Sequence, residues 1–197
     1  GRNAMALQEA APAGTAADAA AQVLSPVGQH WLAGLLAHAH GMAALCAPTA
    51  AAYSRYQGSL MAPRAALWGR DNRGALLRVV GQPGDAGTRI ENRLGEPLAN
   101  PYLCIAAQVL AGLDGLHEHR DPGPAATANP YTSGQGAALP DNLGAALNAL
   151  ATDPVLCAGL GEPLVRAFTT IKHQELARRA AAADVQEWDR RDLFARY

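Results

Sequence analysis

The segment between residues 55 and 93 carries the side chains best suited to chemistry on a charged ligand. It holds only three acidic residues, Asp71, Asp85 and Glu91, but seven of the chain's fifteen arginines: Arg55, Arg64, Arg70, Arg73, Arg78, Arg89 and Arg93. Arginine stays charged and offers a planar fork of donors to carboxylates and phosphates. Converging arginines around one carboxylate suit an anionic ligand together with a metal ion such as Mg²⁺. A solvated basic sheet face held by ion pairs is the alternative, and composition and spacing leave both open.

The run from Arg89 to Leu94 alternates charged and less polar residues. Successive side chains on a strand point to opposite faces, so Arg89, Glu91 and Arg93 are expected to share one face. Short runs at 66–68 and 75–80 are separated from this one by Gly, Asp, Asn and Pro, which is typical of strands joined by turns.

Helices are expected around these strands. Ser25-Pro26 and Asn100-Pro101 each pair an N-cap residue with a proline at the first helical position, and apolar helical spacing carries these helices to about Leu45 and Leu116. Later elements follow as a loop at 120–140, a short helix from Asp141 to about Ala151, a turn or two after Asp153-Pro154, and one long surface helix from about Glu162 to Trp188. The pattern predicts an α+β fold with few antiparallel strands packed with helices. Residues 1–24 are expected to be a loose arm, and residues 25–197 one domain portion.

Several other groups of residues give little evidence of a functional site. Cys46, Cys104 and Cys157 are odd in number and widely spaced, so we interpret them as small hydrophobic residues in a reducing compartment and not as a disulfide framework or zinc ligands. The two His-x-His pairs, 38–40 and 117–119, lie at helix ends, where positions i and i+2 point apart, and we expect surface or helix-end histidines. Arg178-Arg179 and Arg190-Arg191 are expected to be solvated helix charges. Neither a glycine-rich phosphate loop nor a nucleophile elbow occurs.

Length and charge limit the class of protein. A chain of 197 residues suits one domain, and its formal net charge of −1 argues against nucleic-acid binding. The sequence contains no stretch of 18 apolar residues, so no membrane span is expected. The first residues lack the charged and apolar regions of a signal peptide and an initiator Met, so we expect a cut or processed end and a cytoplasmic location.

Four segments, in order and at consistent spacing, give the chain a specific resemblance. They are residues 24–39 (LSPVGQHWLAGLLAHA), residues 48–63 with Pro48-Thr49, Tyr53-Ser54-Arg55 and Ala62-Pro63, residues 68–93 with WGRDNR and RIENR, and residues 99–115 (ANPYLCIAAQVLAGLDG). Together they resemble the C-terminal part of the catalytic domain of the glutamine synthetase family. The resemblance implies an ATP-dependent ligase of nitrogen metabolism that joins the γ-carboxylate of glutamate to ammonia or an amine through γ-glutamyl phosphate. It also implies a divalent metal, Mg²⁺ or Mn²⁺, and a homo-oligomer in the full-length parent.

The resemblance assigns roles around glutamate and the transferring phosphate. Arg55 matches the arginine that binds the α-carboxylate of glutamate. Arg73 matches the arginine that meets the transferring phosphate. Arg93 matches the arginine near the substrate carboxylate, where it stabilises developing charge.

The resemblance also assigns nucleotide and metal roles. Arg78 and Arg89 match the pair that binds ATP, alongside Arg73. Glu91 matches a glutamate that ligates the metal facing the nucleotide phosphates.

Departures from the family pattern leave two hypotheses. Met61 stands where the family has a flap glutamate that takes a proton from ammonium, which favours a larger amine, polyamines among them. Asp85-Ala86-Gly87 stands where the family often has a lysine, and the small N-terminal domain, paired glutamates and metal-binding histidines of the family precede the matching region. We therefore expect an incomplete catalytic domain, inactive by itself. The alternative is a non-catalytic remnant, a module that binds a nucleotide or a carboxylate without ligase activity.

Overall fold

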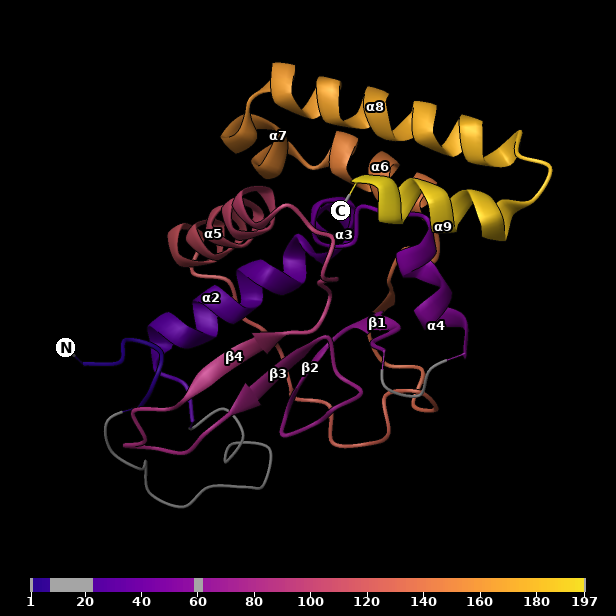
Figure 1. The fold of residues 1–197 in the computed structure, drawn as a ribbon. Helices are drawn as coiled ribbons and strands as arrows, with labels where there is room; N and C mark the ends of the chain where they lie inside the picture. The colour runs from indigo at the N-terminus through magenta and orange to yellow at the C-terminus, as the bar shows by residue number, and fades with distance from the viewer. Residues whose placement is uncertain (1, 8–22, 59–61, 197) are drawn as a thin grey trace.

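The computed structural model describes residues 2–7, 23–58 and 62–196. The helices are α2 (Pro26–Ala37), α3 (Ala39–Cys46), α4 (Arg55–Gly58), α5 (Pro101–His117), α6 (Leu143–Thr152), α7 (Pro154–Leu160), α8 (Glu162–Ala180) and α9 (Val185–Arg196), and a 3-10 turn, η1 (Ala51–Ser54), precedes α4. The strands are β1 (Ala65–Ala66), β2 (Trp68–Arg70), β3 (Leu77–Val80), β4 (Arg89–Asn92) and β5 (Ala137–Ala138). In Figure 1 the sheet β2–β3–β4 lies at one end, α2, α3 and α5 lie in the middle, and α6 to α9 lie at the other end.

The α+β class is confirmed, with one difference in how the strands pair. β3 and β4 are antiparallel, with Arg78 opposite Glu91, and the two-residue strands β1 and β5 are antiparallel as well. β2 and β3, however, are parallel, with Gly69 beside Arg78. The expectation of antiparallel strands is therefore wrong for this pair. The backbone reverses twice between the two strands, and Asp71, at the first reversal, has a left-handed φ of 49°.

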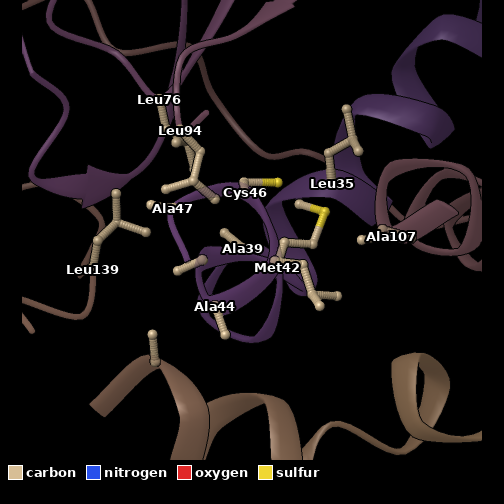
Figure 2. Packing of buried hydrophobic residues seen from close by; sticks show 14 of the residues in the cluster. Leu35, Ala39, Met42, Ala44, Cys46, Ala47, Leu76, Leu94, Ala107 and Leu139 are labelled. Carbon is tan, nitrogen blue, oxygen red and sulfur yellow. The ribbon is translucent and has the colours of Figure 1, made fainter. Parts of the chain in front are cut away.

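Helix α3 lies at the centre of the core. Its residues Ala39, Met42, Ala44 and Cys46 are almost fully buried. Figure 2 shows side chains from α2, from α5 and from the segments next to the strands around them. Most of these side chains are small, so close packing depends on helix backbones that approach one another.

Helices α2 and α5 meet backbone to backbone at two glycines. A Cβ at Gly34 would overlap the backbone oxygen of Ala111, and one at Gly115 would overlap the backbone oxygen of His30. No larger residue fits either position without separating the helices. The spacing of these glycines fixes how α5 lies over α2, and through α5 it fixes the end of the segment that follows β4.

Two expected helices are each interrupted, and the interruptions correct the sequence prediction. The helix expected from Ser25 to Leu45 ends at Ala37 and restarts at Ala39, because His38 leaves helical geometry (φ −102°, ψ 10°) and turns its ring between two carboxylates. The long helix expected over 162–188 ends at Ala180. A new helix starts after Asp184, whose Oδ1 accepts the backbone N–H of Glu187 at 3.0 Å.

The helix caps follow the sequence closely. Ser25 Oγ accepts the N–H of Gly28, and Asn100 Oδ1 accepts the N–H groups of the first turn of α5, as expected. Asp153 caps α7 as expected. The cap of α6 is Asn142 instead of Asp141, and the Asp141 carboxylate accepts a hydrogen bond from the Asn142 side chain at 2.7 Å.

Parts of the expected N-terminal arm make contacts with the body. Ala6 pairs with Leu24 in an antiparallel bridge, and both are buried. Asn3 Nδ2 donates to the backbone oxygen of Thr88 at 2.7 Å. Residues 8–22, the rest of the expected arm, and Met61 lie outside the described residues. No single helix within the described ranges has the length and apolar character to cross a membrane; α6 and α7, bent by 80° at their junction, pass that test only as a pair.

Candidate active site on the arginine face

Strand register collects the charged residues on one face of the sheet. Leu77 and Val79 are completely buried on the face toward the core, so the residues that alternate with them point away from it. Arg78 is directly opposite Glu91 on β4. The backbone N–H of Arg93 donates to Leu76 at 3.0 Å, which continues the ladder one residue beyond β4. We call the side chains of Arg78, Glu91 and Arg93 the arginine face.

A chain of ion pairs joins the residues of the arginine face. Arg78 Nη1 donates to Glu91 Oε2 at 3.2 Å, and Arg78 Nη2 donates to Asp71 Oδ1 at 3.1 Å. Arg93 Nε lies 3.6 Å from the other carboxylate oxygen, Glu91 Oε1. Glu91 thus holds two arginines side by side on the polar face. The arrangement presents two guanidinium groups and one shared carboxylate, which is the charge pattern expected from the sequence.

Asp71 is a partner that sequence reasoning did not assign. It follows β2, and its N–H donates to the backbone oxygen of Val79 on the parallel strand. Its left-handed backbone turns the carboxylate toward Arg78. Asp is one of the few residues that adopt this conformation easily, so an Asp at a strand end beside Asn72 was the available signal.

Arg55 binds the chain segment that leaves the arginine face. Its Nη1 donates to the backbone oxygen of Gly95 at 3.0 Å, and its Nη2 donates to those of Arg93 at 3.1 Å and Leu94 at 3.3 Å. Its guanidinium carbon lies 5.2 Å from the centre of the Tyr56 ring, and the Tyr56 hydroxyl donates to Leu94 as well. Arg55 and the arginine face are therefore brought together, through the backbone of residues 93–95.

Glu96 is a second unassigned residue that holds this segment. Its carboxylate accepts the backbone N–H of Thr49 at 3.0 Å and the Thr49 hydroxyl at 3.1 Å. Burial raises the pKa of Glu96, and the two hydrogen bonds from Thr49 oppose this rise. The N–H of Glu96 donates to the backbone oxygen of Cys46, so residues 93–96 are tied to α3 and to the loop that precedes η1.

Arg73 and Arg89 lie at the margin of the arginine face. Arg73 is exposed in the turn between β2 and β3. Arg89 is exposed at the start of β4, and its Nη1 donates to the backbone oxygen of Gly87 at 3.0 Å. Gly87 belongs to the turn that precedes β4, where Asp85 Oδ1 accepts its N–H at 2.7 Å. Within the described ranges neither arginine joins the ion pairs of Arg78, Glu91 and Arg93.

Two buried donors on these arginines point to an anion. Arg55 Nε and Arg78 Nε are buried and have no acceptor among the described residues. A buried guanidinium N–H without an acceptor is costly, and a carboxylate or phosphate oxygen is the acceptor that suits it best. The residues present therefore fit an anionic ligand such as a nucleotide phosphate.

The same residues do not make a metal site by themselves. Across the described residues no three His, Cys, Asp or Glu side chains come together in a way that could hold a metal ion. Glu91 is one carboxylate, already paired with Arg78 and Arg93. One carboxylate binds Mg²⁺ weakly, because this ion needs several oxygen ligands.

His38 lies at a helix end, between α2 and α3, as expected, but it is not a surface residue. His38 is buried, with Nδ1 2.8 Å from Asp153 Oδ2 and Nε2 2.9 Å from Asp114 Oδ2. Arg120 Nε donates to the same oxygen of Asp114 at 2.5 Å. The sequence offered no helical periodicity that would reveal this pairing, because the three partners come from positions up to 115 residues apart. His117 is exposed at the end of α5, as expected.

Comparisons with known proteins agree with the geometry. A family model described as "Glutamine synthetase, catalytic domain" matches residues 5–192. The chain is 37% identical over 183 residues to the gamma-glutamylanilide synthase of Acinetobacter sp, a match that covers 88% of this chain and 36% of that protein. It is 38% identical over 165 residues to the glutamate–methylamine ligase of Methyloversatilis universalis, covering 77% of this chain and 36% of that protein. A glutamine synthetase of Halobacterium salinarum is 36% identical over 173 residues, covering 84% of this chain and 37% of that protein.

Solved structures give the same result. A structure titled "GmaS/ADP complex-Conformation 1" has a TM-score of 0.73 and 35% identity, covering 88% of this chain and 40% of that chain. A structure titled "Apo GmaS without ligand" has a TM-score of 0.73 and 38% identity, and the match covers 86% of this chain and 38% of that chain. The chain thus spans 36 to 40% of the length of the proteins it matches here.

Proposed function

Because the chain belongs to the glutamine synthetase family, we propose that it supplies the C-terminal part of the catalytic domain of an ATP-dependent ligase. The reaction joins the γ-carboxylate of glutamate to ammonia or an amine. ATP phosphorylates the carboxylate to γ-glutamyl phosphate, and the amine then displaces phosphate. Residues 25–197 form this portion in the proposal, with residues 1–24 preceding it.

The observation that carries the proposal is the arginine face. Arg78 and Arg93 are held side by side by Glu91, and the buried Arg78 Nε lacks an acceptor among the described residues. Two fixed guanidinium groups can neutralise the negative charge of a nucleotide's phosphates and of the phosphoryl group in transfer. Fixing them in advance lowers the cost of ordering flexible side chains when the ligand binds.

The roles divide by position. Arg78 binds nucleotide phosphate directly. Arg89 and Arg73, at the margin of the arginine face, bind phosphate as well. Arg93 stabilises charge that develops at the glutamate carboxylate, and Arg55 meets the glutamate α-carboxylate through Nε while its other nitrogens hold residues 93–95. Glu91 orients Arg78 and Arg93, and it supplies one ligand toward Mg²⁺ or Mn²⁺. A single carboxylate does not hold this metal by itself, because the ion needs several oxygen ligands.

We propose an amine larger than ammonia as the second substrate. Met61 replaces the acidic flap residue that the family uses to hold ammonium, and a thioether neither binds a cation nor accepts a proton. Two of the similar proteins bear names that refer to an anilide and to methylamine. A less charged flap suits an alkyl or aryl group better than ammonium.

A calorimetric titration of the full 197-residue chain with ATP and Mg²⁺ tests the nucleotide role. Replacing Arg89 with Ala should weaken binding by about 1.5–3 kcal/mol, or roughly 10- to 150-fold, if it donates to phosphate. Arg178→Ala on the exposed side of α8 is the control and should leave the affinity unchanged. Equal affinities for wild type and Arg89→Ala would remove Arg89 from the site.

One observation favours the second candidate, a nucleotide- or carboxylate-binding module without ligase activity. Glu91 is paired with two arginines, and the described residues supply no cluster of metal ligands. Phosphate release separates the two candidates. The chain is given Mg·ATP, glutamate and, in turn, ammonium, methylamine and aniline, alone and together with the N-terminal half of a relative. Phosphate release that depends on an amine supports the ligase, whereas binding without release in any mixture supports the module.

A further inference from the structure

Two cysteines that are far apart in the sequence have their sulfur atoms in contact. Cys46 is the last residue of α3 and is almost fully buried, and Cys104 lies in the first turn of α5 and is half-buried. Their Sγ atoms are 3.5 Å apart, although 58 residues separate them. Figure 2 shows Cys46 within the cluster of buried hydrophobic residues to which Leu94 and Leu35 also belong. The sequence-based interpretation of unrelated small hydrophobic residues misses this contact.

The two thiols differ in exposure and acidity. The hydrogen bond with Cys46 lowers the pKa of Cys104 to about 7; burial opposes this effect, and a hydrogen bond from Gln108 Nε2 adds to it. The hydrogen bond to Cys104, together with burial, raises the pKa of Cys46. Cys104 is thus the accessible nucleophile and Cys46 the buried second thiol.

We propose that Cys46 and Cys104 form a redox modification site, at which a small disulfide of the glutathione class converts the two thiols into an intramolecular disulfide. The Cys104 thiolate attacks one sulfur of the small disulfide, the S–S bond breaks, and one small thiol leaves with a proton from solvent. Cys46 then loses its proton and attacks Cys104 Sγ, and the second small thiol leaves with that proton. Two protein thiols are oxidised and one small disulfide is reduced to two thiols.

Little movement of the two cysteines is needed to form the disulfide. The sulfur atoms must approach from 3.5 Å to about 2.05 Å, a change that side-chain rotation and a small shift of the ends of α3 and α5 can supply. Both cysteines connect to the segment that leaves the arginine face. The backbone oxygen of Cys46 accepts the N–H of Glu96, and Gln108, which donates to Cys104, accepts a hydrogen bond from Asn92 at 3.2 Å. The disulfide therefore ties this segment more firmly to α3 and α5.

Cys157 provides an internal control within the same chain. Its Sγ lies 3.2 Å from the backbone oxygen of Leu150, and burial raises its pKa. Cys104, whose pKa is lowered, ionises more readily than Cys157. The lower nucleophilicity of the more acidic thiolate offsets part of this advantage, and Cys157 has no second thiol beside it among the described residues.

The test uses the reduced full chain in glutathione buffers of increasing disulfide-to-thiol ratio at pH 7. Remaining thiols are blocked with N-ethylmaleimide, and intact mass and peptide mapping identify the products. We expect one linked peptide joining Cys46 to Cys104 and one blocked thiol at Cys157, with the same linkage in Cys157→Ser. In Cys46→Ser, Cys104 should stop at the mixed disulfide with glutathione.

Three results would overturn the proposal. One is a stable glutathione adduct on Cys104 in the wild type, because Cys46 then fails to displace it. The second is a linkage that includes Cys157 or joins two chains. The third is that N-ethylmaleimide still reacts with all three cysteines after incubation in the most oxidising buffer, because no disulfide has then formed. The wild-type peptide map decides among these results even if a serine variant folds poorly.

Discussion

Removing His38 should change how the stability of the protein depends on pH. Both ring nitrogens of His38 face carboxylate oxygens, Asp153 Oδ2 at 2.8 Å and Asp114 Oδ2 at 2.9 Å. A neutral imidazole has only one N–H donor, so both contacts are hydrogen bonds when the ring is an imidazolium. The hydrogen bond to Asp153 raises the pKa of His38 above 6.5, burial opposes this, and the hydrogen bond to Asp114 adds to the rise.

The sign of the effect follows from the raised pKa. The folded state holds the His38 proton more tightly than the unfolded state does, so the stabilisation is fully present below pH 6.5 and is lost as the pH rises through the folded pKa. Between the two values the free energy of unfolding should fall by at most about 1.4 kcal/mol per pH unit. His38→Ala should cost about 3–5 kcal/mol at pH 6, since it removes a cationic partner from two buried carboxylates and, among the described residues, leaves Asp114 paired with Arg120 alone.

Urea denaturation between pH 5.5 and 8.5, followed by circular dichroism, measures both effects. The difference in unfolding free energy between wild type and His38→Ala should shrink as the pH rises, which separates His38 from other titrating groups such as Cys104. His117→Ala, at an exposed histidine of the same protein, is the control and should follow the wild type. A difference that stays constant across this range would refute the imidazolium bridge.

Three further changes test the helix packing, a helix cap and the proposed disulfide, each by urea denaturation. Gly34→Ala should destabilise by about 3 kcal/mol or more, because its Cβ overlaps the backbone of Ala111 on α5. Asn100→Ala should cost about 1 kcal/mol, because Oδ1 caps α5 with two hydrogen bonds. Oxidation of Cys46 and Cys104 should stabilise by about 4 kcal/mol, because the disulfide closes a loop spanning 58 residues of the unfolded chain, and Cys46→Ala should abolish the gain. If oxidation still stabilised the Cys46→Ala variant, another modification would be the cause of the gain in unfolding free energy.

Local rules were enough to predict the caps and the side-chain alternation. Ser25, Asn100 and Asp153 cap their helices as expected, because a cap depends on a few neighbouring residues. The alternation of Arg89, Glu91 and Arg93 likewise predicts a shared face from one strand alone. That Arg78 lies opposite Glu91 depends on the register of two strands, which the separate runs did not determine.

Two of the missed features, the burial of His38 and the cysteine contact, depend on contacts between distant segments. His38 interrupts a periodic helix because Asp114 and Asp153 lie beside it. Cys46 and Cys104 meet because α5 packs against α3. Local propensity contains none of these pairings, so the helix expected from 25 to 45 runs too far.

Arg55 shows how one residue can serve both the fold and a ligand. The resemblance implies that it binds the α-carboxylate of glutamate, yet Nη1 and Nη2 donate to the backbone oxygens of Gly95, Arg93 and Leu94. These bonds fix the chain immediately after Glu91, and they set where the Arg93 side chain begins. The buried Nε, which has no acceptor among the described residues, remains as a donor to a carboxylate. A ligand bound there would interact with the same guanidinium that holds residues 93–95, so substrate binding and the position of Arg93 are physically coupled.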